Sequence, residues 1–403
     1  MSVKTKDYTL YNEICKCEDL DYLAECLSSD LAQNEKTSKL VRSEAFWRRA
    51  FEDRWPHLNK KKAKSKTWLQ TYMEMHAAET IENLNPDDCT RKTIDNLQNL
   101  CSQHVKELNL TQMVPNNVVD NEHIPISCFL ECFPHLTKLH ITYSVKDLRR
   151  QFEFGCYDPT LLDIKDLSNG LANCTHLRSL KIYRTRLCGG TAFLFDSLLR
   201  CGLEELSLPH CSLGDEGAAH VASLVQSNAM LRYLDLCDNE IGNIGGQLLA
   251  SAIFESSNED SESDELSLLG LSLRLNPIKD EAASKIFKGL TFNKQIKFVD
   301  LSCCSITAKV FEQFALCYKN NAHLEEINLS NNYLGKAFSE KFVEEQLSNQ
   351  QIRILDLRVT GCDSEILKTV EKQLYDNRKR IEHTLSIRAG KWRQSVIERR
   401  RRT

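Results

Sequence analysis

Acidic side chains recur at one position of a repeated motif. They are the first candidates for metal binding or catalysis in this sequence. Asp235, Asp300 and Asp356, together with Asn328, occupy equivalent positions in different copies of the motif. Carboxylates spaced one repeat apart have the chemistry to bind a metal ion or to move a proton. This position faces water in every copy, however, and a solvated strip is then the commoner outcome. We expect no catalytic residue in the row.

Motifs typical of common enzymes are missing from the rest of the sequence. It contains no phosphate-binding loop ending in Gly-Lys-Ser/Thr, no Gly-x-Ser-x-Gly elbow and no His-Glu-x-x-His pair. The 11 histidines are scattered singly. These features favour a protein that is not an enzyme and that uses no cofactor.

The cysteines give no strong metal-binding pattern. Cys15 and Cys17 form a Cys-x-Cys pair, and Cys128 and Cys132 lie four residues apart, but no second half follows at metal-ligand spacing. The sequence from Met1 to Asp7 has no apolar signal segment, and no apolar run is long enough to cross a bilayer. We therefore expect no metal site, and an intracellular protein whose 17 cysteines are mostly reduced.

Leucine-rich repeats are the elements that position the acidic row. Residues 231–241 follow the pattern L-x-x-L-x-L-x-x-N-x-L, which is a short strand and a turn, and residues 242–253 continue with helical spacing. In the strand half, Leu231, Leu234 and Leu236 should point inward. Asn239 should bond the backbone of the neighbouring coil. In the helical half, we expect these residues to pack against the strand layer: Ile244, Leu248, Leu249, Ala252 and Ile253.

Further copies of the motif flank this one. Its first apolar position recurs at Leu177, Leu203, Leu231, Leu268, Ile296, Leu324 and Ile352. Its turn position holds Cys211, Asn239, Asn276, Cys304 and Asn332. The usual step of 28 residues leaves room for a helix in each coil, as in the ribonuclease-inhibitor-like subtype. Weaker strands are expected at 105–110 and 136–141. Stacked copies bury each other's apolar faces, so the pattern predicts an α/β solenoid. Its horseshoe has parallel strands inside and helices outside.

Asparagines and one insertion mark the ends of the helical segments. Asn lies three residues before the strand at Asn228, Asn293, Asn321 and Asn349. Because Asn tolerates a left-handed backbone, each should end a helix. One step is 37 residues long, and its insertion at 255–265 has six acids, four serines and no base. We expect a mobile, solvated loop; the alternative is a phosphorylated or base-binding loop.

Four regions divide the 403 residues: a helical N-terminal domain or cap (1–100), the repeat solenoid (101–362), a C-terminal helix (363–387) and a basic tail (388–403). Phe46, Trp47, Phe51 and Trp55 read as the core of the cap, or else as a partner-binding module. The tail has seven basic residues against Glu398. It would attract an acidic polymer such as RNA, acidic protein tails or anionic lipid, or remain solvated without a partner.

Solvent-facing positions of the strands mix charged and bulky side chains. Exposed Tyr, Phe and Arg are the types that anchor protein interfaces, so the concave surface is predicted to bind other proteins. The candidate partner-binding residues are Tyr183, Arg184, His210, Arg232, Tyr233, Asp235, Arg274, Phe298, Asp300, Arg353 and Arg358.

Several stretches resemble a known family. They are residues 152–158, 166–177 and 181–187, which lead into and form the first regular repeat, and the earlier Phe46–Pro56 and Thr67–Tyr72. Together they are similar to the family of dynein regulatory complex subunit 5, also called T-complex-associated testis-expressed protein 1. The similarity covers the chain from about residue 45 to 362.

The resemblance implies a function. It points to a non-enzymatic scaffold or adaptor of the nexin–dynein regulatory complex, which links doublet microtubules in motile cilia and flagella and helps regulate dynein-driven sliding. The partners implied are other subunits of that complex and tubulin, with no small-molecule substrate, no membrane and no nucleic acid. The location implied is cytoplasmic and cytoskeletal, at the axoneme.

Two alternatives remain open. Phe46–Pro56 followed by Trp68 is similar to the end of an F-box, which favours a leucine-rich repeat substrate receptor of a ubiquitin ligase, although the usual Leu-Pro opening is absent. A Ran GTPase-activating-type protein also has repeats of this length. That family carries an acidic tail, whereas this chain ends in a basic one and has an extra N-terminal domain.

Overall fold

A computed structural model describes residues 28–58, 65–113, 123–143, 158–187, 189–254, 268–345 and 347–400. The chain forms two compact units, Met1–Thr185 and Arg186–Thr403. The insertion predicted to be a mobile loop (255–265), the lead-in at 152–157 and most of the lysine-rich segment after Pro56 lie outside the described residues.

The first unit begins with helices and continues with parallel strands. Its strands are β1 (Glu107–Leu110), β2 (Lys138–Ile141) and β3 (Ser179–Ile182), in the order of the sequence. Its helices are η1 (Ser29–Gln33), α3 (Glu35–Leu40), α4 (Glu44–Arg54), α5 (Trp68–Glu82), η2 (Pro86–Asp88), α6 (Arg91–Cys101), α7 (Ile126–Leu130) and α8 (Leu161–Ala172). The two early strands predicted from weak copies of the motif are therefore present.

Aromatic side chains of α4 and of the residue after it form a core with α5. Phe46, Trp47, Phe51 and Trp55 are all buried. The Trp47 and Trp55 rings lie 5.4 Å and 5.2 Å from the ring of Tyr72 on α5. Ser43 caps the start of α4, and the helix ends at Arg54, just before Pro56. These rings stabilise the unit from inside instead of facing a partner.

Helix α5 covers the outer edge of β1. The Glu74 Oε1 atom accepts hydrogen bonds from the backbone N–H groups of Lys106 and Glu107, at 3.3 Å and 3.0 Å. Lys66 in turn pairs with the carboxylates of Glu74 and Glu107. At the other end of the strand, Glu82 accepts the N–H of Thr111. An edge strand presents unpaired N–H groups, and these two carboxylates satisfy them.

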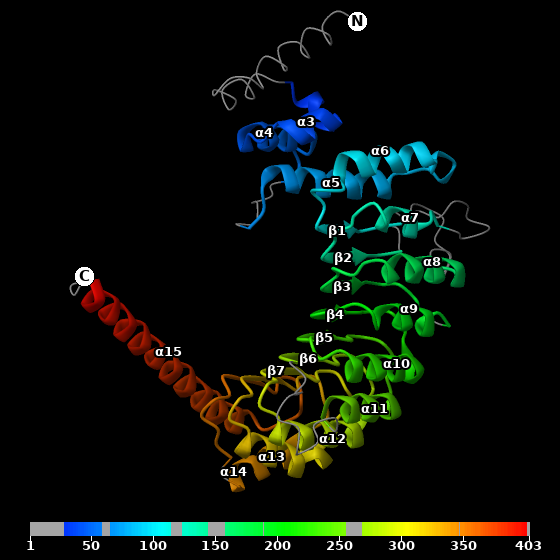
Figure 1. The fold of residues 1–403 in the computed structure, drawn as a ribbon. Coiled ribbons are helices and arrows are strands. Elements are labelled where there is room, and N and C mark those ends of the chain that lie inside the picture. Colours follow the sequence, from blue (N-terminus) through cyan, green and yellow to red (C-terminus); the bar gives the residue numbers. More distant parts are fainter. Residues whose placement is uncertain are drawn as a thin grey trace, which may run out of the picture. The chain divides into compact units, whose positions relative to one another are not determined.

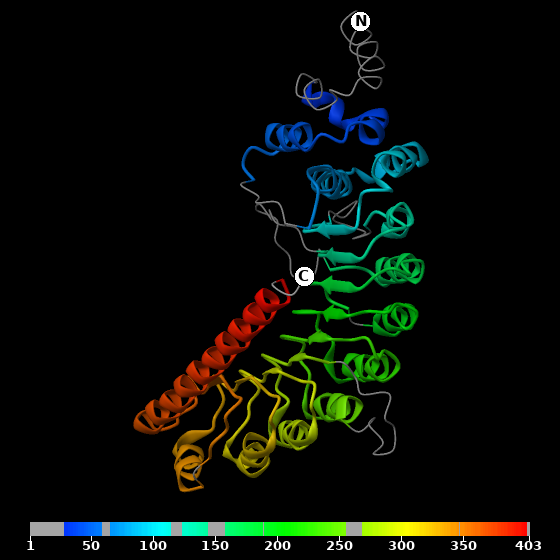
Figure 2. The same ribbon diagram turned by 60° about the vertical axis from the view of Figure 1, so that its left-hand side comes forward.

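The second unit repeats one strand and one helix per coil (Figures 1 and 2). Its parallel strands are β4 (Glu205–Ser207), β5 (Tyr233–Asp235), β6 (Gly270–Ser272), β7 (Phe298–Asp300), β8 (Glu326–Asn328) and β9 (Ile354–Asp356). Its helices are α9 (Thr191–Leu198), α10 (Gly214–Ser227), α11 (Asn243–Phe254), α12 (Lys279–Phe292), η3 (Ala308–Val310), α13 (Phe311–Asn320), α14 (Gly335–Glu344) and α15 (Ser364–Arg400). Helices α9 to α14 lie on one side and the strands on the other, which confirms the leucine-rich repeat solenoid.

The apolar layer between strands and helices is partly as predicted. The inward strand residues Leu231, Leu234 and Leu236 are buried, and on α11 so are Leu249, Ala252 and Ile253. The same expectation was wrong for Ile244 and Leu248, which are 66% and 42% exposed. Two glycines explain the difference, because Gly245 and Gly246 face the neighbouring coils instead. A Cβ at Gly246 would lie 2.8 Å from the Cβ of Ala282. This close approach turns Ile244 and Leu248 outward.

Buried asparagines hold successive coils together at the turns. The Oδ1 atom of Asn276 accepts the N–H groups of Asn239 and Ile241 in the preceding coil, at 2.9 Å and 3.0 Å. Its Nδ2 group donates to the carbonyls of Leu236 and Leu273. Asn239 and Asn332 make equivalent bonds to their own preceding coils. The predicted contact of the Asn239 amide with a neighbouring coil is confirmed.

Asparagines also end the helices, but not for the reason that the sequence suggested. Asn228, Asn293 and Asn321 are the C-caps of α10, α12 and α13, with φ values of −118°, −72° and −76°. None of the three is left-handed. Their side chains act instead: the Nδ2 group of Asn321 donates to the Asn293 carbonyl at 2.9 Å, one coil back. The position was predicted correctly for these three, and the cause is side-chain bonding between coils. The prediction was wrong for Asn349, because α14 ends at Glu344 with Glu345 as its C-cap.

Helix α15 begins as the helix of the last coil and then continues. Asn377 makes the same bond as the helix-ending asparagines, since its Nδ2 group donates to the Asn349 carbonyl at 2.6 Å. Val370 and Leu374 are buried against the coil. The helix nevertheless runs to Arg400, beyond Ile387, where the sequence pattern placed its end. The segment after Asn377 has no proline and is rich in Arg, which is a good helix former.

None of the helices in the described parts of the chain is both long and apolar enough to span a membrane.

Candidate functional site

Outward-facing side chains of β4 to β9 form two parallel rows, which we call the strand face. The parallel register aligns the first residue of each strand, giving the row Glu205, Tyr233, Gly270, Phe298, Glu326 and Ile354. It aligns the third residue as well, giving the row Ser207, Asp235, Ser272, Asp300, Asn328 and Asp356. Alternation along a strand places both rows on the same surface.

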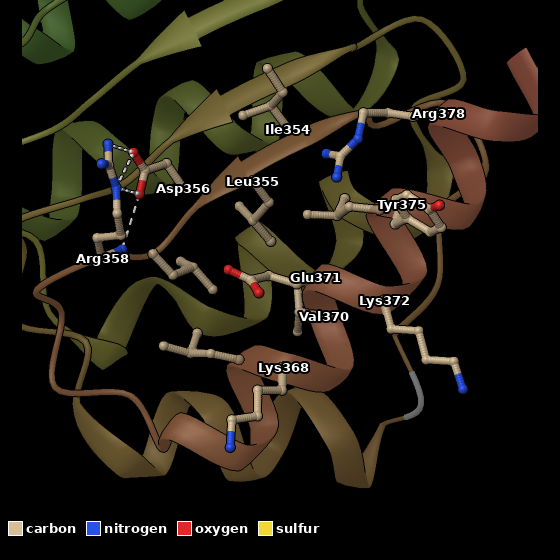
Figure 3. Close-up of a pocket in the computed structure, with 13 residues that line it drawn as sticks. Ile354, Leu355, Asp356, Arg358, Lys368, Val370, Glu371, Lys372, Tyr375 and Arg378 are labelled. Atoms are coloured by element: carbon tan, nitrogen blue, oxygen red, sulfur yellow. Dashed lines mark hydrogen bonds and ion pairs between the residues drawn. The ribbon is translucent and has the colours of Figure 1, made fainter. Parts of the chain in front are cut away.

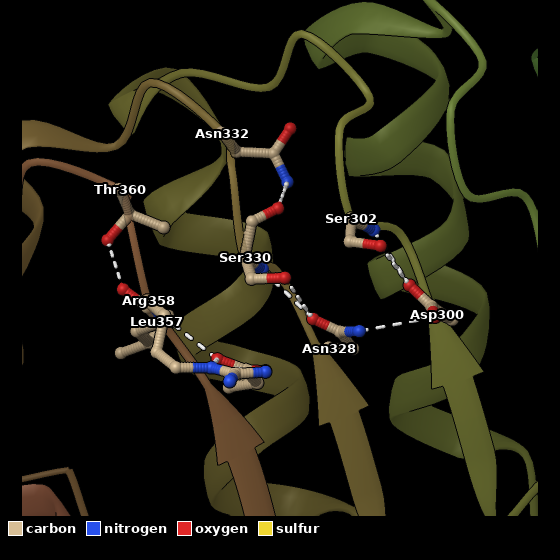
Figure 4. Close-up of polar contacts among 9 residues, drawn as sticks. Asp300, Ser302, Asn328, Ser330, Asn332, Leu357, Arg358 and Thr360 are labelled. Carbon is tan, nitrogen blue, oxygen red and sulfur yellow. Dashed lines mark hydrogen bonds and ion pairs between the residues drawn. The ribbon is translucent and has the colours of Figure 1, made fainter.

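The acidic row takes part in the turns that end the strands. The Oδ1 atom of Asp300 accepts the N–H and the Oγ–H of Ser302, at 2.9 Å and 2.7 Å (Figure 4). In the next coil, Asn328 accepts the same two groups of Ser330 and donates to the Oδ2 atom of Asp300 at 3.2 Å. Asp and Asn occupy the row because their side chains form Asx turns, which set the backbone conformation just after each strand. In the described ranges, no group of three His, Cys, Asp or Glu residues is placed to hold a metal ion.

Asp356 at the end of the row is neutralised within its own coil. The Arg358 guanidinium donates to both carboxylate oxygens, with the Nε group 2.9 Å from Oδ1 and 3.0 Å from Oδ2. This hydrogen-bonded pair holds the pKa of Asp356 below its usual value, against the opposing effect of partial burial. Arg358 itself is 82% exposed, so the pair lies at the surface.

A groove of about 340 Å³ runs along the strand face from β5 to β9. It is lined by Tyr233, Leu234, Asp235, Gly270, Leu271, Ser272, Phe298, Val299, Asp300, Glu326, Ile327, Asn328, Ile354 and Asp356. Its exposed apolar groups are Tyr233 and Ile354, at 45% and 42% exposure. The groove thus combines aromatic surface with four carboxylates, which suits recognition of another molecule better than catalysis.

Four of the predicted partner-binding residues line the groove together: Tyr233, Asp235, Phe298 and Asp300. Arg232, Arg274, Arg353 and Arg358 lie outside it. Of these, Arg353 pairs with Glu325 and Arg358 with Asp356. His210 also lies outside, with its Nδ1 atom 2.5 Å from the Oδ2 atom of Asp238.

Tyr183 and Arg184 belong to the first unit. They follow β3, and the guanidinium of Arg184 lies 5.2 Å from the centre of the Tyr183 ring. The structure therefore gathers only part of the predicted set in one place. The binding role of all eleven residues stays a prediction.

Some groove residues were missed by sequence reasoning. Glu326 and Ile354 follow Phe298 at steps of one repeat, so the register alone would have found them. Gly270 and Ser272 had no comparable signal, because small residues at exposed positions carry no chemistry of their own. Their importance comes from the neighbours on either side.

A second cavity of about 610 Å³ lies between β9 and α15 (Figure 3). Leu355, Val370 and Leu374 are buried beside it, and Glu371 points from α15 toward Leu355. The Arg378 guanidinium donates to the Arg353 carbonyl at 2.7 Å, which ties the helix to the last strand. Its lining has four basic side chains and two acidic ones, namely Arg358, Lys368, Lys372 and Arg378 against Asp356 and Glu371. We regard it as the end of the solenoid.

Stacked strand–helix coils, asparagine-bonded turns and an open strand face define a leucine-rich repeat protein. A family model described as "Leucine Rich repeat" matches residues 227–250, from the last residue of α10 through β5 and most of α11.

Known proteins with similar sequences include dynein regulatory complex subunit 5 of several mammals. The chain is 26% identical over 212 residues to dynein regulatory complex subunit 5 of Macaca fascicularis, which covers 47% of this chain and 42% of that protein. The Mus musculus protein is 26% identical over 211 residues, covering 46% and 42%. These matches confirm the resemblance predicted from the sequence. The chain spans less than half the length of these relatives.

Ribonuclease inhibitor of Mus musculus is 24% identical over 242 residues, covering 53% of each protein. This similarity agrees with the 28-residue subtype of the repeats. Among solved structures, the Rad7 and Elc1 complex from yeast includes a chain with a TM-score of 0.50 and 18% identity, covering 92% of this chain and 89% of that one. At that identity, the likeness shows the fold alone.

Proposed function

We propose that this chain is a non-enzymatic scaffold or adaptor subunit of the nexin–dynein regulatory complex in motile cilia and flagella. It binds other proteins through the strand face and helps regulate dynein-driven sliding of doublet microtubules. Its partners are other subunits of that complex, with tubulin as a second candidate, and its location is the axoneme. The similarity over 212 residues to dynein regulatory complex subunit 5 carries this proposal.

Features of the strand face support a binding role. The groove is open along several coils, presents Tyr233 and Ile354 to solvent, and lies on a rigid array of short strands. Hydrogen bonds hold the three aspartates of the groove in fixed positions, Asp235 and Asp300 within turns and Asp356 through Arg358. Carboxylates fixed in this way can recognise a partner by its shape and charge. Solenoids expose such extended surfaces for partners of matching shape.

Expression of a tagged copy in ciliated cells tests the proposal. We expect the tag along the axoneme, and we expect subunits of the regulatory complex among the co-purified proteins. A strand-face variant, Tyr233→Ala with Phe298→Ala, should lower that recovery at least about fivefold, because aromatic anchors carry much of the energy of an interface. The matched control is Ile244→Ala with Leu248→Ala, which removes exposed apolar groups from the helix side.

Either of two results would contradict the proposal. A wild-type protein spread diffusely through the cytoplasm would remove the axonemal role. Loss of partners in the helix-side control, with the strand-face variant unaffected, would move the binding surface to the helices.

The two alternatives have their own decisive outcomes. Co-purification with the adaptor of a cullin ubiquitin ligase would favour the F-box-type receptor, although Phe46, Trp47 and Phe51 are buried and unavailable to an adaptor. Stimulated GTP hydrolysis by Ran would favour the GTPase-activating type.

A further inference from the structure

One coil of the strand face carries only small residues. On β6, the outward positions are Gly270 and Ser272, whereas β5 has Tyr233 and Asp235 there and β7 has Phe298 and Asp300. Each neighbouring strand thus presents an aromatic ring followed by a carboxylate. These six residues form what we call the β6 recess, which is part of the groove of about 340 Å³.

Gly270 is required by the way the aromatic rings pack. A Cβ at this position would lie 3.0 Å from the Cδ1 atom of Tyr233 and 3.9 Å from the Cβ atom of Phe298. The Tyr233 ring therefore lies against the backbone of β6, and any side chain at 270 would displace it. The Tyr233 ring borders the recess on one side, Phe298 lines the groove on the other, and Gly270 contributes only backbone atoms between them.

The recess contains two carboxylates and no basic side chain, and Arg274, two residues after Ser272, lies outside it. Asp235 accepts hydrogen bonds from the Cys237 N–H and the Ser207 Oγ–H, at 3.1 Å and 3.0 Å. Asp300 is bonded by Ser302 and Asn328. All of these donors are neutral. No lysine or arginine lines the groove, and none in the described part of the chain forms an ion pair with either carboxylate.

We propose that the β6 recess binds an arginine side chain in a basic segment of a partner protein. A guanidinium group stacks on aromatic faces and donates hydrogen bonds in its own plane. Each neighbouring strand offers one ring and one carboxylate: Tyr233 with Asp235 on β5, and Phe298 with Asp300 on β7. These two pairs stand two strands apart, on the order of 10 Å, so one guanidinium uses the ring and the two carboxylate oxygens of a single pair, with the small residues of β6 leaving room for it. This inference rests on the proposed function and specifies the chemistry of the partner.

The spacing and the charge together favour arginine over other groups. An acidic or phosphorylated partner would meet uncompensated carboxylates, and a purely apolar one would leave them desolvated. Lysine carries the charge but lacks the planar group that stacks on a ring while bonding two acceptors. The recess therefore discriminates by shape as well as by charge.

Fluorescence anisotropy with the full-length chain tests the inference. The probes are labelled hexa-arginine, hexalysine and hexacitrulline peptides at low salt. We expect hexa-arginine to bind at least about fivefold more tightly than hexalysine, and hexacitrulline to bind weakest, because citrulline keeps the shape without the charge. The double variant Asp235→Asn with Asp300→Asn should weaken hexa-arginine binding about tenfold and remove the preference over lysine.

The control changes the same amount of charge elsewhere. Glu240→Gln with Glu312→Gln removes two exposed carboxylates outside the recess, and it should leave the arginine preference intact. Tyr233→Ser with Phe298→Ser should abolish the preference and leave the charge-driven binding of hexalysine. Thermal unfolding of each variant shows that it is folded.

Other results would overturn the inference. They are equal affinity for arginine and lysine, or a control variant that loses binding as strongly as the recess variant. Deletion of residues 388–403 separates a partner from the chain's own basic end: if the deletion raises hexa-arginine affinity severalfold, the recess holds that end and not a partner. These peptide results are independent of axonemal location, so failure of one proposal leaves the other testable.

Discussion

Single buried polar side chains determine how the coils of this protein stack. Asn332 is 2% exposed, and its Oδ1 atom accepts the N–H groups of Cys304 and Ile306. Asn332→Ala would remove the partner of these two donors and of three carbonyls, so we expect the free energy of unfolding to fall by about 3 kcal/mol. Urea titration followed by circular dichroism measures this loss. The neighbouring Asn331 is exposed at φ 58°, and Asn331→Gly should change stability by less than about 0.5 kcal/mol.

A histidine in the first unit makes stability depend on pH. Burial, reinforced by the positive charge of Arg54, lowers the pKa of His76 from 6.5 to about 4. The folded chain therefore binds this proton more weakly than the unfolded chain. Its contribution to the free energy of unfolding falls as pH drops from about 6.5 to about 4, by about 3 kcal/mol in total. Below that range the contribution is constant.

Comparison of the wild type with His76→Gln between pH 7 and pH 4 measures this effect. The variant should lose the His76 part of the slope, whereas His57→Gln, at an exposed position, should retain it. Parallel slopes for the wild type and His76→Gln would show that His76 does not titrate differently in the two states.

At the scale of elements, the contact between α11 and α12 depends on one missing side chain. A Cβ at Gly289 would lie 2.2 Å from the Cγ atom of Phe254, the last residue of α11. Gly289→Ala should therefore destabilise the protein by about 1–3 kcal/mol, because the ring must move away from its present position. Addition of Phe254→Ala should recover part of the loss. If the double variant is no more stable than Gly289→Ala, the destabilisation has another origin.

The elements also show what sequence alone can and cannot predict. Recurrence of the repeat motif places Tyr233, Phe298 and their strands correctly, because each coil repeats the geometry of the one before it. Individual helix faces were harder: Ile244 and Leu248 have the right spacing for a core, but Gly245 and Gly246 decide which side approaches the neighbours. The groove depends on the small side chains of Gly270 and Ser272, which leave room between their larger neighbours. A sequence motif does not show how much volume such small residues leave unfilled.

For the molecule as a whole, charge is distributed unevenly along the chain. Its formal net charge is −4, and its isoelectric point is about 6.3. Residues 388–403 contribute seven basic side chains and one acidic one, so deleting them changes the net charge from −4 to −10. Proteins are least soluble near zero net charge. We expect minimum solubility near pH 6.3 for the full chain and at a lower pH for the truncated one.

Turbidity measured across pH 4 to 8 provides this comparison. An unchanged minimum would mean that the basic end is already neutralised by an acidic part of the same molecule. Deletion of the acidic stretch 255–265 should move the minimum in the opposite direction, which distinguishes a general effect of charge from a specific contact.

Asn377 has a consequence for engineering. It bonds to the carbonyls of Asn349 and Ile352 as though another coil were to follow, although the chain remains helical. An additional repeat inserted after this residue would find the asparagine contact between coils already formed. Each added repeat would lengthen the platform by about 5 Å, one strand spacing. The reach of such a protein between two attachment points could then be chosen by counting modules.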